Sequence, residues 1–446
     1  MNSSGNSFDA IWFPFTFDRD ARENPPKIVG RGEGPYVFDT DGKAYLDAIG
    51  SWWVSIFGHN HPEISAAVRA QLEKLDQVIM AGFVAETTVE AARLLASLLP
   101  PPLRRVFFSD DGSTAVEAAL KIALQYWALR GENRTEFVAL SGAYHGDTLG
   151  AMSVGMVPRY HTLFHERFKK HHFAHSPYCY RCPVNEEPHT CRAQCMDSLE
   201  RILTEHGSHL AACIFEPMVQ GAVGMRVYPA KVLERIFTLC REHGVLLIAD
   251  EVAVGFGRTG RMFACHHANR TPDIMCLAKG LTAGCLPMAA TAVTEAIYDE
   301  FRGDHTTDRI LHHGHSFTGS PPAAAAACAS LRMIVRERIP ESLEGTIDYF
   351  LDGLRQFDEF EIVGDIRGLG MIGALELVSD RATRTPPDPA DRTAYRICRE
   401  AVSRGVILRP LGDVVYFMPP YILSTEQIDT MFRVCRESIH HVMNHG

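Results

Sequence analysis

The sequence predicts an α/β fold in which a mostly parallel, doubly wound sheet forms a large domain and both chain ends form a smaller α+β domain. Residues 245–249 and 274–278 are continuous apolar runs, typical of strands buried on both faces of a parallel sheet. Strands alternate with helical patterns throughout residues 61–330, as doubly wound folds require. We therefore assign residues 61–330 to the large domain, and residues 1–60 and 331–446 to the small one.

Local patterns place the other elements along the chain. An Asp-Gly turn between two apolar stretches predicts a β-hairpin over residues 36–47. Apolar residues at helical spacing, with prolines near several ends, predict helices at residues 62–75, 87–99, 115–130, 231–243, 321–338, 392–403 and 425–442. Further strands are expected at residues 105–109, 136–140, 213–217 and 371–377, and a second hairpin over residues 406–418.

Composition and charge narrow the possible functions. The 446 residues are 46% hydrophobic and 22% charged, as in an ordinary globular enzyme. A net charge of -10 without a basic cluster argues against a nucleic-acid partner. Residues 1–6 lack the features of a secretion signal, and no apolar run is long enough to cross a membrane. Twelve cysteines without a signal are typical of cytosolic thiols, so we expect a cytoplasmic protein.

Two of the apolar strands are each followed by a residue suited to catalysis. Asp250 and Lys279 bring a carboxylate and an amine to the carboxyl edge of the sheet, where open α/β folds bind ligands. Pyridoxal phosphate (PLP) needs this pair, the amine for a Schiff base and the carboxylate for the pyridine nitrogen. Taken singly, the aspartate could cap a helix and the lysine could be a solvated strand end. P-loop NTPases also have a strand ending in Asp-Glu, but the chain lacks G-x-x-x-x-G-K-[ST].

A helix start in the first half of the chain suits a phosphate group. Gly112 and Ser113 open a predicted helix, where free N–H groups attract anions. Such a motif is weak alone, because serine and threonine cap most helices, but beside Lys279 it is the expected site of the PLP phosphate. Tyr144 follows the next strand and can stack on the pyridine ring, or be a half-buried turn residue. His145 alone is more typical of a structural histidine.

One segment has the spacing of a metal site. Cys179 and Cys182 are separated as in structural zinc sites, and His189, Cys191 and Cys195 follow them. The second cysteine pair has a wider spacing and no zinc-domain context surrounds it. We therefore expect no metal and keep structural zinc as the alternative.

A long, ordered signature surrounds the acid and the amine. It comprises Ile-Ala-Asp-Glu at 248–251, Gly-Phe-Gly-Arg-Thr-Gly at 255–260, Pro-Asp-Ile at 272–274 and Ala-Lys-Gly at 278–280. These segments resemble the signature of class III aminotransferases of PLP fold type I. The resemblance implies a PLP-dependent transaminase with a ping-pong reaction, a small-molecule amine donor and keto acceptor, and a homodimer with shared active sites.

The resemblance also implies roles for individual residues. The catalytic residues would be Lys279, Asp250 and Tyr144. The cofactor would be held by Gly112, Ser113, Tyr144, Asp250, Lys279 and, from the second subunit, Ser316. The substrates would be bound by Phe15, Trp52, Tyr144, Gly314, Arg409 and Tyr416, with the arginine taking a carboxylate as a bidentate fork.

Within the family, the chain is most similar to the branch that aminates 8-amino-7-oxononanoate in biotin biosynthesis, with S-adenosylmethionine or lysine as the amine donor. The segments that carry this similarity are residues 51–53, 144–148 with 150–154, and 408–420. The chain departs from the branch at three places. Phe15 stands where a tyrosine is usual, Gly-His-Ser at residues 314–316 replaces Gly-Pro-Thr, and Asp111 replaces a serine beside the phosphate site, where it adds an unhelpful negative charge. The first two departures leave the substrates open, and the second is more typical of lysine users.

Three alternatives remain open. Another class III transaminase, acting on an ω-amine or a secondary metabolite, is favoured by Phe15. A PLP-dependent aminomutase or decarboxylase would share the same lysine and aspartate. A non-enzymatic interaction protein would need Lys279 to have no catalytic role and the cysteine segment 179–195 to hold zinc.

Overall fold

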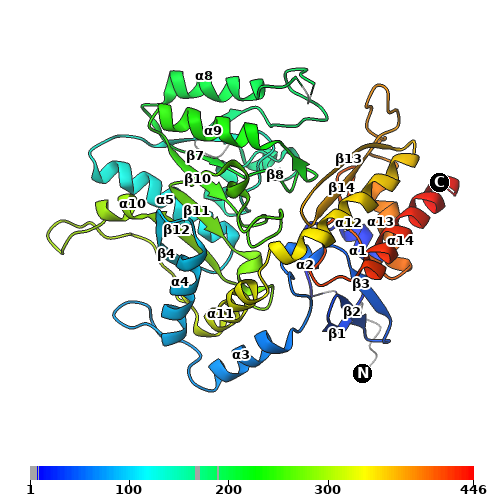
Figure 1. The fold of residues 1–446 in the computed structure, drawn as a ribbon, viewed down its shortest axis with the longest axis horizontal. Helices are drawn as coiled ribbons and strands as arrows, with labels where there is room; N and C mark the ends of the chain where they lie inside the picture. The colour runs from blue at the N-terminus through cyan, green and yellow to red at the C-terminus, as the bar shows by residue number, and fades with distance from the viewer. Residues whose placement is uncertain (1–7, 9, 166–170, 188–189, 446) are drawn as a thin grey trace.

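The computed structural model describes residues 8, 10–165, 171–187 and 190–445. The segment 1–6, where no signal is expected, and the candidate ligand His189 lie outside these residues. Figure 1 shows two lobes, one formed by the middle of the chain and the other by segments from both chain ends.

A seven-stranded sheet forms the centre of the large lobe. Across the sheet its strands are β4 (Leu103–Ser109), β12 (Ala289–Thr294), β11 (Ile274–Leu277), β10 (Leu246–Asp250), β7 (Leu210–Phe215), β5 (Glu136–Leu140) and β6 (His172–Ala174). Neighbouring strands from β11 to β6 are parallel, whereas β12 is antiparallel to both of its neighbours. The mostly parallel sheet is confirmed, and β12 is a strand that the sequence patterns did not reveal.

Helices cover both faces of this sheet. Every residue of β10 is buried, and its side chains alternate between two apolar clusters, with Leu247 in one and Ile248 in the other. The cluster around Ile248 includes α5 (Gly112–Leu129), and the cluster around Leu247 includes α9 (Ala230–Glu242). The other helices of this lobe are α3 (Pro62–Leu72), α4 (Glu86–Leu98), α6 (Leu149–Ser153), α7 (Pro158–His165), α8 (Asp197–His206), α10 (Glu295–Glu300) and α11 (Pro321–Arg336). The doubly wound arrangement is therefore confirmed.

Both ends of the chain share sheets in the small lobe. One sheet contains β1 (Val29–Glu33), β2 (Tyr36–Asp39), β3 (Ala44–Asp47) and β15 (Val406–Ile407). The other contains β13 (Val363–Leu369), β14 (Ile372–Leu377), β17 (Val414–Phe417) and β16 (Pro410–Leu411). The hairpin predicted over residues 36–47 is present as β2 and β3. The second predicted hairpin is wrong in extent, because β15 pairs in parallel with β3 and only β16 turns back onto β17.

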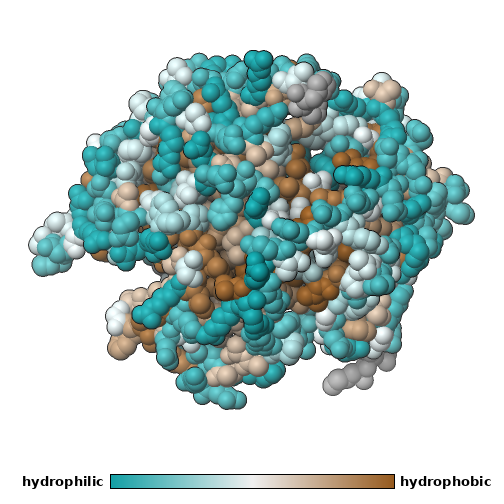
Figure 2. All heavy atoms as spheres, viewed as in Figure 1, coloured by the Kyte–Doolittle hydropathy of each residue, from teal (hydrophilic) through white to brown (hydrophobic). Residues whose placement is uncertain are grey.

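The remaining elements are short or belong to the small lobe. They are α1 (Asp18–Glu23), α2 (Gly50–Trp53), α12 (Glu344–Arg355), α13 (Thr393–Ser403) and α14 (Thr425–Asn444), the 3-10 turns η1 (Gln194–Met196), η2 (Ala264–Ala268), η3 (Lys279–Thr282), η4 (Glu341–Leu343) and η5 (Gln356–Glu359), and the ribbon of β8 (Val219–Gln220) and β9 (Arg226–Val227). None of the helices in the described ranges is long and apolar enough to cross a membrane. Figure 2 shows a largely hydrophilic face with apolar surface gathered near its centre.

Candidate active site

The predicted acid and amine reach the same edge of the sheet. Asp250 is the last residue of β10, and Lys279 follows the end of β11, the parallel neighbour of that strand. Both side chains line a cavity of about 410 Å³. The backbone of Lys279 is left-handed, with a φ of +41°. Such a conformation costs a non-glycine residue about 1–3 kcal/mol and is typical of functional sites.

A buried histidine holds the Asp250 carboxylate in place. His145 Nδ1 lies 2.7 Å from Asp250 Oδ2, and the backbone N–H of Val252 donates to Oδ1 at 3.1 Å. Both His145 and Asp250 are buried, at 3% and 5% exposure. As a single histidine in a loop, His145 resembles a structural residue in the sequence. Its position in the loop after β5, at the same edge of the sheet as Asp250, was the one signal that pointed to the site.

The amine of Lys279 lies in a mixed apolar and acidic environment. Burial lowers the pKa of Lys279 below its ordinary value, and the carboxylates of Asp250 and Glu216 partly oppose this shift. The nitrogen lies 5.1 Å from the centre of the Trp53 ring. A lowered pKa leaves more of the amine neutral, which suits a lysine that acts as a nucleophile and a base.

Asp111 caps the helix at the phosphate end of the cavity. Its carboxylate accepts a hydrogen bond from the backbone N–H of Thr114 at 2.9 Å, and its own N–H donates to the Thr114 hydroxyl at 3.0 Å. Asp111 thus has a structural role at the helix start in addition to the negative charge that it brings to the phosphate site. The carboxylate lines the cavity, but it is occupied in starting α5.

Gly112 and Ser113 form the first turn of α5 and line the same cavity. A Cβ on Gly112 would lie 2.7 Å from Val252 Cγ1, so a larger residue does not fit here without a shift. The Ser113 hydroxyl accepts a hydrogen bond from the backbone N–H of Asp147 at 3.0 Å. The free N–H groups of this helix start can hold an anion, as the sequence suggested.

Tyr144 is held from three sides at the mouth of the cavity. Its hydroxyl donates to Asp147 Oδ2 at 2.8 Å, and its backbone N–H donates to Glu216 at 3.0 Å. Its ring lies nearly parallel to that of His161, with centroids 5.9 Å apart and planes 19° apart. Burial raises the pKa of Glu216 to about 7, while His145 and backbone N–H groups act in the opposite direction.

A second cavity, of about 1340 Å³, leads outward from Lys279 and shares Tyr144 with the first. We call the first the inner cavity and the second the outer cavity. Its wall is aromatic: Phe15 meets Trp52 edge to face, with centroids 5.7 Å apart. The guanidinium of Arg409 lies 4.4 Å from the Trp52 ring centre. No described residue forms an ion pair with Arg409, so its charge is available to a ligand in the cavity.

Comparison with known proteins assigns the family. Residues 17–439 match the family Aminotransferase class-III. The chain belongs to this family. Its members are PLP-dependent, so the chain is a PLP-dependent transaminase, and the fold is that of known PLP-dependent transaminases.

Relatives of known name agree with this assignment. Adenosylmethionine-8-amino-7-oxononanoate aminotransferase from Geobacter sulfurreducens is 44% identical over 434 residues, which span 97% of this chain and 96% of the relative. A solved structure of the enzyme of that name from Methanocaldococcus jannaschii has a TM-score of 0.91 at 36% identity, covering 97% of each chain. A PLP-bound amine transaminase from an uncultivated Pseudomonas species has a TM-score of 0.92 at 36% identity, covering 97% of this chain and 98% of the other.

The inner cavity fits PLP. Asp250, held by His145, offers a fixed buried carboxylate for a protonated ring nitrogen. Lys279 offers an amine of lowered pKa in the same cavity. Gly112 and Ser113 offer the start of α5 to a phosphate group. These side chains have the chemistry that PLP requires, and they converge on one volume.

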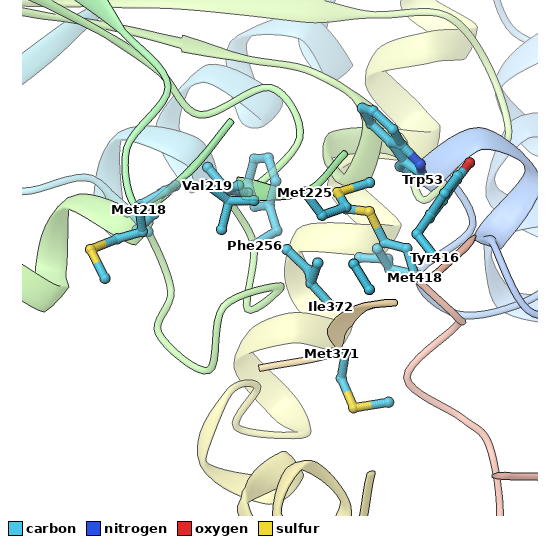
Figure 3. Packing of buried hydrophobic residues seen from close by; sticks show 14 of the residues in the cluster. Trp53, Met218, Val219, Met225, Phe256, Met371, Ile372, Tyr416 and Met418 are labelled. Carbon is cyan, nitrogen blue, oxygen red and sulfur yellow. The ribbon is translucent and has the colours of Figure 1, made fainter. Parts of the chain in front are cut away.

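Two substrate-site residues expected from this chain, Tyr416 and Gly314, line neither of its cavities, and Ser316, expected from the second subunit, lies on the surface. Tyr416 is fully buried behind Trp53, with ring centroids 6.1 Å apart, and lines neither cavity (Figure 3). Gly314 and Ser316 are exposed and also line neither cavity. The backbone carbonyl of Ser316 accepts a hydrogen bond from the side chain of Gln77 at 2.6 Å.

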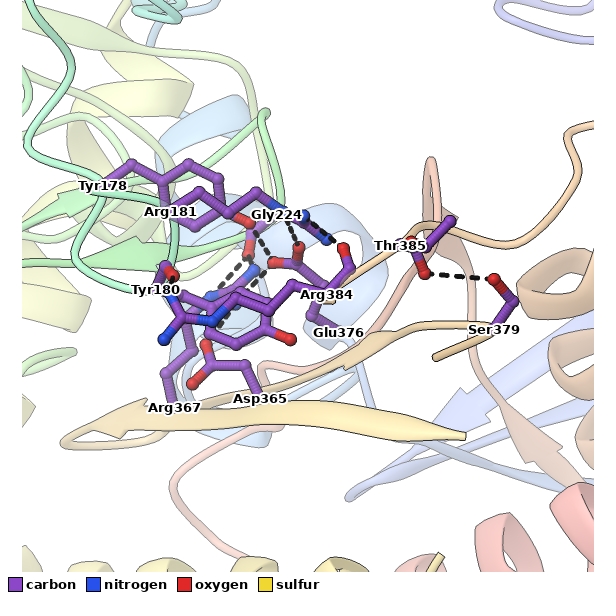
Figure 4. Close-up of polar contacts among 10 residues, drawn as sticks. All are labelled: Tyr178, Tyr180, Arg181, Gly224, Asp365, Arg367, Glu376, Ser379, Arg384 and Thr385. Carbon is purple, nitrogen blue, oxygen red and sulfur yellow. Dashed lines mark hydrogen bonds and ion pairs between the residues drawn. The ribbon is translucent and has the colours of Figure 1, made fainter. Parts of the chain in front are cut away.

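Ionic contacts anchor the cysteine segment. Figure 4 shows Tyr178 and Arg181 reaching Glu376 of β14, which also pairs with Arg367 of β13. Arg181 Nε lies 3.0 Å from one carboxylate oxygen of Glu376, and Arg367 Nη1 lies 2.8 Å from the other. Across the described ranges, no group of three or more His, Cys, Asp and Glu side chains is placed to hold a metal ion.

Proposed function

We propose that the enzyme transfers an amino group to 8-amino-7-oxononanoate, which gives 7,8-diaminononanoate in biotin biosynthesis. The observation that carries this proposal is the charge pattern of the outer cavity. Asp147 and Arg409 both line it, and neither forms an ion pair with a described residue. The rings of Phe15 and Trp52 form an apolar wall beside them. An ammonium group, a carboxylate and an aliphatic chain match these three features in turn. The names of the relatives from Geobacter and Methanocaldococcus support the same substrate.

The side chains of the inner cavity would divide the chemistry between them. When bound, PLP supplies a protonated ring that withdraws electrons from the substrate carbon bearing the amine. Asp250 would hold the proton on the ring nitrogen, and His145 fixes the carboxylate for that task. The Lys279 nitrogen would take the proton from the substrate carbon and pass it on to the cofactor, as a general base and then a general acid. Because the keto acceptor is aminated by the reverse path, the same residues serve both halves of a ping-pong reaction.

We propose S-adenosylmethionine or lysine as the amine donor. The outer cavity, of about 1340 Å³, is large enough to hold a large donor. The names of the relatives favour S-adenosylmethionine, whereas the Gly-His-Ser sequence at residues 314–316 favours lysine. The acidic net charge of -10 supports small-molecule partners rather than nucleic acid, and the cysteine content supports a cytoplasmic location.

We also propose a homodimer in which each subunit completes the other's active site. Five apolar side chains are exposed on two neighbouring segments: Ile79, Met80, Phe83, Val84 and Phe317. The hydrogen bond from Gln77 to the Ser316 carbonyl joins these segments, so Ser316 lies on the same surface. A second copy seated there would cover apolar surface that is costly to expose. It would receive Ser316 at its phosphate site. We retain the division into residues 1–60 with 331–446 and residues 61–330, which the pairing of β15 with β3 supports.

A second candidate is a class III transaminase with a simple ω-amine or a secondary metabolite as substrate. Phe15 favours it, because a phenyl ring gives the outer cavity an apolar contact where a hydroxyl would bind a polar group. The structural similarity to an amine transaminase supports it equally.

The visible absorption of the PLP-loaded protein separates the two candidates. S-adenosylmethionine, lysine and a simple ω-amine are added separately, and the bleaching of the cofactor band identifies the donor. 8-Amino-7-oxononanoate is then added to the bleached enzyme. Recovery of the band, with 7,8-diaminononanoate detected by mass spectrometry, supports the proposal. Bleaching by the ω-amine alone, without recovery, would overturn the biotin assignment and leave the second candidate.

A further inference from the structure

Tyr160 is a cavity residue that no sequence motif singled out. It lies on α7 and lines the outer cavity, and its ring meets Phe15 edge to face, with centroids 5.0 Å apart and planes 63° apart. The next residue, His161, stacks on Tyr144, so this helix holds Tyr160 close to the inner cavity. The Tyr160 hydroxyl makes no hydrogen bond to any described residue.

An unpaired carboxylate lines the cavity with Tyr160. Asp147 accepts the Tyr144 hydroxyl at 2.8 Å on Oδ2, and no described lysine, arginine or histidine forms an ion pair with it. Burial, followed by the charge of the Asp147 carboxylate and its hydrogen bond, raises the pKa of Tyr144. The three side chains offer hydrogen-bond acceptors and one negative charge. The cations Arg159 and Lys279 line the same cavity, but neither forms an ion pair with Asp147.

Phe15 cannot complete this cluster. Its ring lies between those of Trp52 and Tyr160, and it has no polar atom. Tyr160 therefore supplies the phenol oxygen on this part of the wall. We propose that Tyr160 is a specificity-determining residue whose hydroxyl, together with the Asp147 carboxylate, binds the ammonium group of the acceptor substrate.

The inference rests on the proposed function, since it concerns the second polar group of an amino ketone. A site that hydrogen-bonds such a group disfavours analogues that lack it, because the hydroxyl of the half-buried Tyr160 and the Asp147 carboxylate would then contact no ligand group. Tyr160 would thus make the cavity prefer an amino ketone over a plain ketone with the same chain and carboxylate. Arg409 would bind both compounds through the carboxylate and would not distinguish between them.

The test compares 8-amino-7-oxononanoate with 7-oxononanoate, which lacks the amine. For the PLP-loaded enzyme and its Tyr160→Phe variant, kcat and KM are measured with the first compound, and an inhibition constant is measured with each compound against the amine donor. Tyr160→Phe should raise KM and the inhibition constant of the amino ketone about tenfold, the lower range for a hydrogen bond to a charged group. It should leave kcat and the inhibition constant of 7-oxononanoate within about twofold of the parent values.

Two further variants separate recognition from a structural effect. Phe15→Tyr should restore tight binding of the amino ketone in the Tyr160→Phe background, because it returns a phenol oxygen to the same wall. Tyr349→Phe is the matched control. It removes a surface hydroxyl on α12 that donates a hydrogen bond to Asp429 of α14 at 2.7 Å. It should leave all of these constants unchanged.

Equal effects of Tyr160→Phe on both compounds, or no effect on either, would overturn the inference. So would a parent enzyme that binds both compounds equally well. The proposed function fails separately, if the parent enzyme does not aminate 8-amino-7-oxononanoate. In that case the inhibition constants against the amine donor still decide whether Tyr160 recognises the amine.

Discussion

Replacing His145 by leucine tests how strongly the site depends on a fixed Asp250 carboxylate. His145 Nδ1 lies 2.7 Å from Asp250 Oδ2, and the N–H of Val252, at 3.1 Å, is the other described donor to that carboxylate. Losing a hydrogen bond to a buried charged group costs about 1.5–3 kcal/mol. His145→Leu should therefore lower the rate of the amine half-reaction by about 10- to 150-fold. The loss should appear in kcat rather than in KM, because the pair lies in the inner cavity.

His145→Asn is the matched variant for this experiment, because an asparagine amide can reach the place of Nδ1 and still donate to Asp250. Stopped-flow absorbance measures the half-reaction, and equilibrium dialysis measures PLP affinity. Thermal unfolding of both variants controls for damage to the fold. His145→Asn should recover most of the rate that His145→Leu loses. A leucine variant with the parent rate, or two variants with equal losses, would refute the reasoning.

Three further predictions concern the two cavities. Gly112→Ala places a Cβ 2.7 Å from Val252 Cγ1 and should weaken PLP binding at least about fivefold in equilibrium dialysis. Val252→Ala, added to this variant, should restore part of the affinity. An unchanged affinity in Gly112→Ala would contradict the close packing of Gly112 at the phosphate site. Arg409→Lys keeps the charge but loses the planar fork, so KM for the carboxylate acceptor should rise about tenfold. The half-reaction with a simple amine that carries no carboxylate should stay unchanged. Equal effects on both reactions would place Arg409 outside the carboxylate site. Burial lowers the pKa of Lys279, so the rate at which apoenzyme captures PLP should rise with pH and level off below pH 10.5, the ordinary pKa of lysine; a plateau only above that value would count against the lowered pKa.

The cofactor half of the site was predictable because strand ends determine it. A continuous apolar run can be buried on both faces only in a covered parallel sheet, and β10 and β11 are buried in this way. Parallel strands then bring their carboxyl ends to one edge, which places Asp250 near Lys279 without further information. The start of α5 follows a strand at the same edge, so the phosphate site was predictable from the same reasoning.

The remaining features depend on contacts that local patterns do not encode. His145 looked structural because a histidine in a loop has many possible partners, and only the fold shows that Asp250 is one of them. The antiparallel strand β12 consists of alanine, threonine and one valine, so it lacks the run of large apolar residues that revealed β10 and β11. Tyr416 lies in a segment similar to a substrate-binding one, yet its strand turns the ring behind Trp53.

The cofactor site and the substrate wall are built differently, and this difference bears on which residues determine substrate specificity. Asp250 and Lys279 lie at the ends of neighbouring strands, and Gly112 and Ser113 begin the helix after a third strand, so the sheet fixes their positions. The outer wall is assembled from Phe15, Trp52, Tyr160 and Arg409, which come from four separate segments and meet only through their side chains. A substitution there, such as the phenylalanine at position 15, changes which groups face the substrate and leaves the contacts of Asp250 intact. The family signature therefore identifies the reaction, whereas the hydroxyls and charges of the outer wall decide which amine and which ketone take part in it.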